Sequence, residues 1–247
     1  MADVKKFNKY GEELEKRLRL QTSPIAVKML KSEADIPADV LRPMKDRNKH
    51  YAQCQAFSLS RRDRLAVAML KEDNWCPGPV LAYGLLQPPD SPAPGGEIMY
   101  EGFEHGEYIG ILSAPLRETS FEPDLVIIYS DTNQLRSMLL SLKEEEKKKV
   151  KSRFFPFSCA WSVTSPVLHN EYWITLPDPG EYVRALTQAG EMIFSIPVQK
   201  LDEFMEGLTA FFQESMFANE QMMMLSDFSQ PDIYKEVFKK WNMEYEG

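Results

Sequence analysis

The sequence lacks the features that bring a protein to nucleic acid or into a membrane. Its formal net charge is -8, and the one strongly charged run, at residues 143–151, sets acids before bases as a solvent-exposed helix does. Nucleic acids and anionic lipid surfaces attract clustered lysine and arginine, so neither is expected as a partner. No stretch approaches the roughly 18 apolar residues that span a bilayer. The polar residues 1–6 also lack the apolar region of a signal peptide, so we expect a cytoplasmic protein.

Cysteine and histidine are scarce, with three of each in 247 residues. An odd number of cysteines in a reducing compartment does not make a disulfide framework, which leaves metal binding, thiol chemistry or packing. No Cys–His or Ser–His–Asp arrangement indicates nucleophilic catalysis. The segment Pro94-Gly95-Gly96 lacks the lysine and the strand-to-helix context of a phosphate-binding loop. The sequence therefore assigns no catalytic residue.

Strand and helix patterns are interspersed along the chain. Strands are expected at residues 25–30, 65–70, 107–115, 124–129, 172–176 and 191–197, and helices at 4–20, 51–62, 80–86, 131–142 and 201–208. The turn at residues 119–123 favours antiparallel pairing of the two strands that it joins. Several connections are too short for a parallel crossover, so we expect residues 1–212 to form a single α+β domain with a mixed, largely antiparallel sheet and packed helices. Residues 213–247 are expected to form a C-terminal helical extension.

The cysteines lie beside structural breaks and aromatic residues. Cys54 is expected near the start of a helix. Cys76 stands in the run Asn74-Trp75-Cys76-Pro77-Gly78-Pro79, and because proline suits the first turn of a helix, Cys76 is expected at a strand-to-helix corner. Ser158 is expected to cap a helix that contains Cys159. The positive potential of a helix N-terminus stabilises a thiolate, so Cys76 and Cys159 are expected to favour that form.

Other residues near the cysteines allow two interpretations each. Trp75, Phe157 and Trp161 either pack in the core or form an apolar shell around a cofactor. The arginines at positions 61, 62 and 64 either lie on a solvated helix face, which is the simpler expectation, or are buried near a cluster, where they could hold an anionic substrate or offset the cluster charge. The loop at residues 88–96 is either a lid or a plain connector. The methionines at positions 222–224 are expected to fill the core or a subunit interface, which leaves a homo-oligomer open.

Five short motifs, in this order, resemble one known family. They are Cys54-Gln55-Ala56, Trp75-Cys76-Pro77, Ser113-Ala114-Pro115-Leu116, Phe121-Glu122-Pro123-Asp124 and Ile193-Phe194-Ser195-Ile196-Pro197. From about Leu14 to Leu208 the chain resembles the domain of unknown function 169 family, which is found widely in anaerobic bacteria and archaea. Its members typically carry cysteines at the positions of Cys54, Cys76 and Cys159. The resemblance thus implies a shared role for the three thiols, although it carries no established reaction.

The principal hypothesis is that Cys54, Cys76 and Cys159 bind a four-iron four-sulfur cluster and leave one iron open to water, substrate or a non-cysteine ligand. Such a protein would act in redox transfer or in binding and activation of a small ligand in anaerobic metabolism. Its partners would be a small molecule or a redox protein.

Three alternatives remain open from the sequence. Zinc is the first, with His50 as a fourth ligand beside the thiols. The second is a metal-free binding module whose aromatic pocket consists of Trp75, Phe157 and Trp161. The third is a thiol enzyme that uses Cys76 as its nucleophile.

Overall fold

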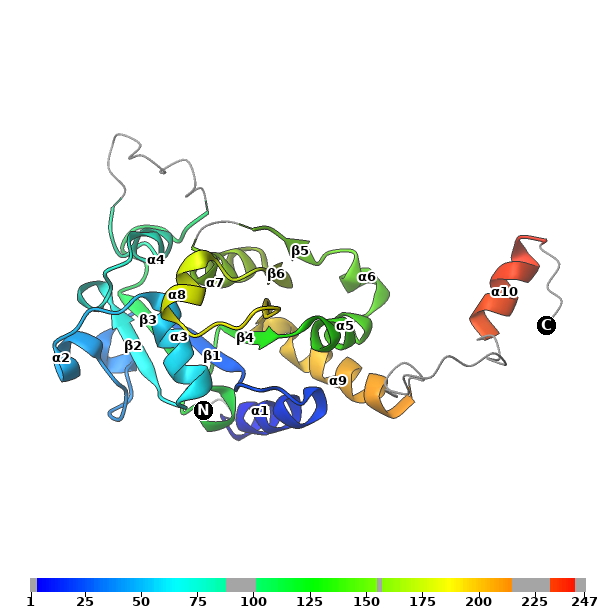
Figure 1. The fold of residues 1–247 in the computed structure, drawn as a ribbon, viewed down its shortest axis with the longest axis horizontal. Helices are drawn as coiled ribbons and strands as arrows, with labels where there is room; N and C mark the ends of the chain where they lie inside the picture. The colour runs from blue at the N-terminus through cyan, green and yellow to red at the C-terminus, as the bar shows by residue number, and fades with distance from the viewer. Residues whose placement is uncertain (1–3, 88–100, 155–156, 215–231, 243–247) are drawn as a thin grey trace. The chain divides into compact units, whose positions relative to one another are not determined.

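A seven-stranded sheet forms the centre of the chain (Figure 1). The computed structural model describes residues 4–87, 101–154, 157–214 and 232–242. The strands are β1 (Ile25–Leu30), β2 (Val67–Leu70), β3 (Gly110–Pro115), β4 (Leu125–Ser130), β5 (Lys151–Ser152), β6 (Trp173–Thr175) and β7 (Met192–Pro197). The helices are α1 (Val4–Leu18), α2 (Pro43–Arg47), α3 (Gln53–Arg62), α4 (Pro77–Ala82), α5 (Thr132–Leu140), α6 (Glu144–Lys147), α7 (Ser158–His169), α8 (Pro179–Arg184), α9 (Val198–Glu214) and α10 (Asp232–Lys240).

The strand order is β2-β3-β1-β4-β7-β6-β5. Every neighbouring pair is antiparallel except β5 and β6, which run parallel. The expected α+β fold with a mixed, largely antiparallel sheet is thus confirmed. The expected pairing of β3 with β4 is wrong, because β1 lies between them and pairs with both. Residues 116–124 therefore cross over one strand instead of forming a hairpin.

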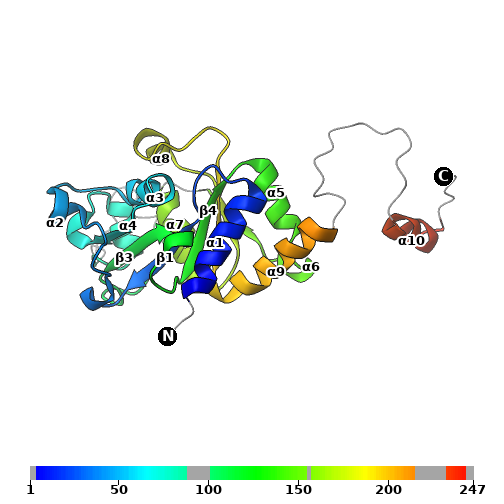
Figure 2. The same cartoon turned by 90° about the horizontal axis from the view of Figure 1, so that it is seen from below.

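The sheet separates two hydrophobic cores. Alternate residues of β1 face opposite sides, so Ile25 and Val27 enter one core while Ala26 and Leu30 enter the other. Helices α1, α5 and α9 contribute to the Ala26 side, and Figure 2 shows α1 and α9 crossing that face. Helices α3, α4 and α7 contribute to the Ile25 side. The Ile25 side, here called the thiol face, carries all three cysteines.

The chain divides into two compact units, Met1–Glu214 and Ser215–Gly247. The first contains the sheet and both cores. In the second, α10 has no buried residue. None of the described helices is long and apolar enough to cross a membrane. The expected division into residues 1–212 and 213–247 stays a prediction, and the loop at 88–96 and the methionines at 222–224 lie outside the described residues.

Candidate metal centre

The three cysteines lie in one buried cluster on the thiol face. Their side chains belong to one core, with exposed fractions of 3% for Cys54, 7% for Cys76 and 4% for Cys159. Cys54 is in the first turn of α3, Cys76 is the N-cap of α4 and Cys159 is in the first turn of α7. The thiols of Cys54 and Cys159 are hydrogen-bonded to each other. The fold thus brings together thiols that are far apart in the sequence.

A short parallel bridge holds the segments that precede Cys54 and Cys76 against each other. The N–H of Tyr51 donates to the carbonyl oxygen of Asp73 at 2.9 Å. The N–H of Trp75 donates to the carbonyl oxygen of Tyr51 at 3.3 Å. The chain then enters α4 at Cys76, with Pro77 as its first residue, as the sequence predicted. The bridge therefore fixes the starts of α3 and α4 relative to each other.

Helix α4 packs closely against the start of α7. A Cβ atom added to Gly78 would lie 2.4 Å from the ring of Phe157, so glycine is required there. Phe157 itself has a left-handed φ of 66°, which is rare for an aromatic residue. The hydroxyl of Tyr83, just after α4, donates to the carbonyl oxygen of Cys159 at 3.0 Å. These contacts set Cys76 and Cys159 on two elements that are held together.

Ser158 joins the start of α7 to the start of α8. The N-cap of α7 is Phe157, so the expected capping role of Ser158 is wrong. Its N–H instead donates to Oδ2 of Asp178 at 2.8 Å, and its hydroxyl donates to Oε1 of Glu181 at 2.6 Å. In return, the N–H of Asp178 donates to the Ser158 hydroxyl at 3.0 Å.

Two carboxylates adjoin the thiol of Cys159. One oxygen each of Asp178 and Glu181 lies with the Cys159 sulfur in a group whose atoms are all within 4.8 Å of one another. Asp178 caps α8, with its Oδ1 accepting from the N–H of Glu181 at 3.1 Å. The Tyr129 hydroxyl donates to Oε2 of Glu181 at 2.8 Å. Sequence reasoning missed both acids, although aspartate before Pro179 is an N-cap signal that locates the start of α8.

Burial and one hydrogen bond between two thiols govern the protonation of this group. Burial raises the pKa of Cys76, and the N–H of Gly78 offsets only part of that rise. The hydrogen bond between Cys54 and Cys159, which stabilises the Cys54 thiolate, lowers the pKa of Cys54 and holds that of Cys159 well above its usual range. Without a metal, the expectation that helix N-termini favour the thiolate is wrong for Cys76, because desolvation is stronger. It is also wrong for Cys159, because the hydrogen bond to Cys54 and then burial both raise the pKa of that thiol.

Burial also raises the pKa of Glu181 to about 7, although hydrogen bonds from Ser158 and Tyr129 lower it in part. The positive charge of Arg184 acts on two of the thiols and lowers the pKa of both Cys54 and Cys76.

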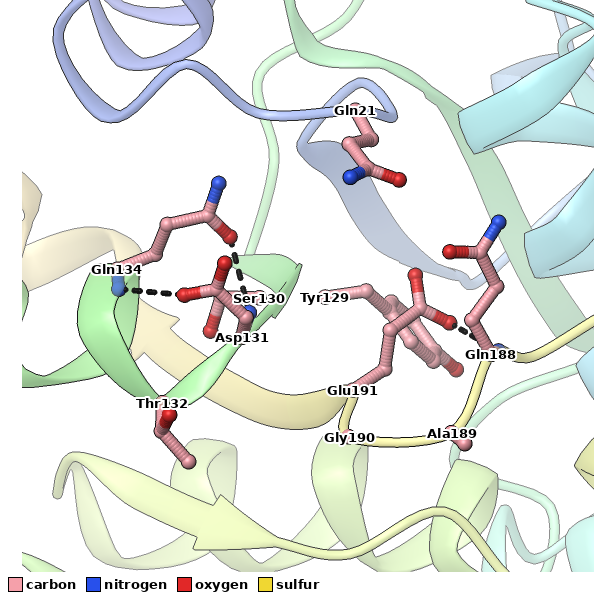
Figure 3. A pocket seen from close by; sticks show the side chains of 10 residues that line it. All are labelled: Gln21, Tyr129, Ser130, Asp131, Thr132, Gln134, Gln188, Ala189, Gly190 and Glu191. Atoms are coloured by element: carbon pink, nitrogen blue, oxygen red, sulfur yellow. Dashed lines mark hydrogen bonds between the residues drawn. The ribbon is translucent and has the colours of Figure 1, made fainter.

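Tyr129, whose hydroxyl donates to Glu181, also lines a cavity of about 210 Å³. The cavity is lined by Gln21, Tyr129, Ser130, Asp131, Thr132, Gln134, Gln188, Ala189, Gly190 and Glu191 (Figure 3). Arg61 stacks 3.9 Å from the centre of the Tyr129 ring and donates to Glu191 at 2.7 and 3.1 Å. The expectation that Arg61 is solvated is therefore wrong, since it is only 2% exposed.

The remaining candidate residues are dispersed. Trp161 is buried, Phe157 is partly buried, and Trp75 is 48% exposed with the Arg184 guanidinium 4.9 Å from its ring centre. None of these three aromatic residues lines the cavity of Figure 3. His50 is exposed and is not a member of the buried thiol cluster.

Comparison with known proteins gives a family and one curated relative. Residues 13–207 match the domain of unknown function 169 family, described as uncharacterised ArCR. An uncharacterized protein of Methanocaldococcus jannaschii is 20% identical over 230 residues, which cover 85% of this chain and 97% of that relative. No solved structure matches. Because the family match covers most of the chain, including all three cysteines, the protein belongs to the domain of unknown function 169 family.

Proposed function

We propose that Cys54, Cys76 and Cys159 hold a four-iron four-sulfur cluster with one iron left without a cysteine ligand. The contact between the thiols of Cys54 and Cys159, with Cys76 buried in the same hydrophobic core, carries this proposal. Thiolates are the usual ligands of iron–sulfur clusters. A bound metal also removes the thiol protons, which offsets the desolvation that raises the pKa of Cys76 and Cys159.

An unpaired polar group next to Cys54 fits such a cofactor. Gln53, directly before Cys54, is fully buried and neither of its amide atoms has a partner among the described residues. Its amide nitrogen is therefore a free donor. Buried polar groups are normally hydrogen-bonded, and cluster sulfurs accept hydrogen bonds that tune the reduction potential.

The charge balance supports the same site. Three thiolates and bridging sulfides give a cluster site negative charge, and Arg184 is placed to offset it. The cluster would supply electron transfer or an open iron that binds a small ligand. The partners would be that ligand or a redox protein in the cytoplasm, and neither nucleic acid nor a membrane is proposed.

Zinc is the second candidate, and one observation favours it. The oxygens of Asp178 and Glu181 beside Cys159 are ligands that zinc accepts together with thiolates. In a zinc site of this kind, a carboxylate would be the fourth ligand instead of His50. A metal-free module with an aromatic pocket has less support, because about half of the Trp75 surface is exposed to solvent.

Anaerobic purification followed by elemental analysis distinguishes these functions. A broad absorption band at about 400 nm, with about four irons and as many acid-labile sulfides per chain, is the result expected for the cluster. One zinc per chain and a colourless protein would favour the second candidate. A protein that stays free of metal after anaerobic reconstitution would exclude both.

Single cysteine substitutions test whether the thiols act together. Cys54→Ala, Cys76→Ala and Cys159→Ala should each abolish the absorption band, because one cluster needs all three thiolates. Ser60→Ala, a buried change on the same helix as Cys54, should retain the band, since Ser60 contacts Ser113 instead. If only Cys76→Ala had an effect, a single reactive thiol would be the better explanation.

A further inference from the structure

Glu181 is a buried carboxylate without a positive partner. Its exposed fraction is 0%, and its two hydrogen-bond donors, the hydroxyls of Ser158 and Tyr129, are neutral. No ion pair to Glu181 exists within the described part of the chain. The closest candidate, Arg61, stacks on the Tyr129 ring and pairs with Glu191 instead.

Such a group is costly unless something compensates its charge. An ionised carboxylate loses several kcal/mol of hydration on burial, so buried charges are paired, protonated or bound to metal. Glu181 lies within 4.8 Å of the Cys159 sulfur through one of its oxygens. Direct coordination to an iron or zinc ion held by the thiols would therefore compensate the lost hydration of this carboxylate with a metal–oxygen bond.

The neighbouring acid has a different role. Asp178 accepts from the N–H of Ser158 and the N–H of Glu181, which ties the starts of α7 and α8 together. Both of its oxygens thus accept from backbone N–H groups; the Ser158 hydroxyl lies 3.2 Å from Oδ2, but its single proton is donated to Glu181. Among the described residues, the oxygens of Glu181 accept only from the side-chain hydroxyls of Ser158 and Tyr129, and a lone pair remains on each for a metal.

We propose that Glu181 is the non-cysteine ligand of the metal centre, completing the coordination begun by Cys54, Cys76 and Cys159. This inference rests on the proposed function. Ser158 and Tyr129 would then be positioning residues, because each holds one oxygen of the carboxylate. The ligand at the open iron would be an oxygen donor, which a small anionic or oxygen-containing substrate can displace.

Mild oxidation tests the assignment. An iron that has lost its protein ligand leaves the cluster more easily than one that is held. The reconstituted wild-type protein and Glu181→Gln are therefore treated with ferricyanide, and iron per chain is measured together with the electron paramagnetic resonance spectrum. We expect the wild type to keep about four irons per chain, and the variant to fall to about three with a three-iron signal.

A matched control separates a ligand from a structural group. Glu146→Gln removes another buried carboxylate, one that is paired with Lys149 and Lys200, and should behave as the wild type. Circular dichroism before reconstitution confirms that each variant is folded.

The outcomes for the two proposals differ. If the wild type takes up no metal, the proposed function and this inference both fail. If the wild type and Glu181→Gln both keep about four irons through oxidation, the cluster stands and Glu181 is not its ligand. If the wild type binds one zinc per chain, the Glu181 inference requires that Glu181→Gln lose affinity for zinc by at least tenfold, as expected for the loss of a ligand.

Discussion

The protonation of Glu181 makes the stability of the metal-free protein depend on pH. Burial raises the pKa of this carboxyl from its usual 4.5 to about 7. At a pH between these two pKa values, Glu181 holds a proton in the folded chain and releases it in the unfolded chain. The free energy of unfolding therefore falls as the pH rises through this window, by roughly 3 kcal/mol at 1.36 kcal/mol per pKa unit.

Urea unfolding of the metal-free protein at pH values from about 5 to 8 checks this prediction, with Glu181→Gln as the matched variant. The variant has no proton to lose at this position, so the difference from the wild type should change across the window. A difference that is the same at every pH would contradict it.

Gly78 is the second residue on which the site depends. In Gly78→Ala the added methyl group would meet the Phe157 ring, whose nearest atoms lie 2.4 Å from the ideal Cβ position. Overpacking of this kind costs about 1–3 kcal/mol, and separation of α4 from α7 would also move Cys76 away from Cys159. We expect lower stability and reduced metal content, measured by urea unfolding and elemental analysis.

A double-mutant cycle identifies the clash as the cause. In a Phe157→Ala background the ring is absent, so Gly78→Ala should cost much less than it does in the wild type. An equal cost in both backgrounds would show that the methyl group is harmful for another reason.

At the scale of elements, the joint between α7 and α8 holds the two carboxylates next to Cys159. Ser158→Ala removes the hydroxyl that accepts from Asp178 and donates to Glu181. Because the partners are buried, the expected loss of stability is about 1–3 kcal/mol. Ser137→Ala is the control, since its hydroxyl donates only to a carbonyl oxygen of its own exposed helix surface. Thermal unfolding of both variants decides the point, and equal melting temperatures would refute a special role for the joint.

Individual elements were predictable where local patterns decide them. The helix α1 follows from apolar residues at spacings of three and four, and three of them, Phe7, Leu14 and Leu18, are buried. Asp131 caps α5 through the N–H of Gln134, as its position before the helix indicated. The role of Ser158 was not predictable, because its partners, Asp178 and Glu181, come from an element 20 residues away.

At the scale of the whole molecule, the long-range arrangement decides what the sequence left open. The fold class follows from short connections, but the position of β1 between β3 and β4 depends on pairings that no local turn specifies. The three cysteines could be selected as candidates from their surroundings and the family resemblance. Their shared burial, and the carboxylates beside Cys159, depend on the packing of four helices on one face of the sheet.

The division of the chain gives a final prediction. The unit Met1–Glu214 contains the whole sheet, both hydrophobic cores and all three cysteines. A chain that ends at Glu214 should therefore fold, bind the same amount of metal and unfold at the same urea concentration as the full-length protein. A chain that ends at Pro197 removes α9, whose Leu201, Phe204 and Leu208 are buried in the core opposite the cysteines. It should be unfolded, because three large apolar side chains leave that core. If the chain ending at Glu214 lost its metal or its cooperative unfolding, residues 215–247 would be part of the functional unit.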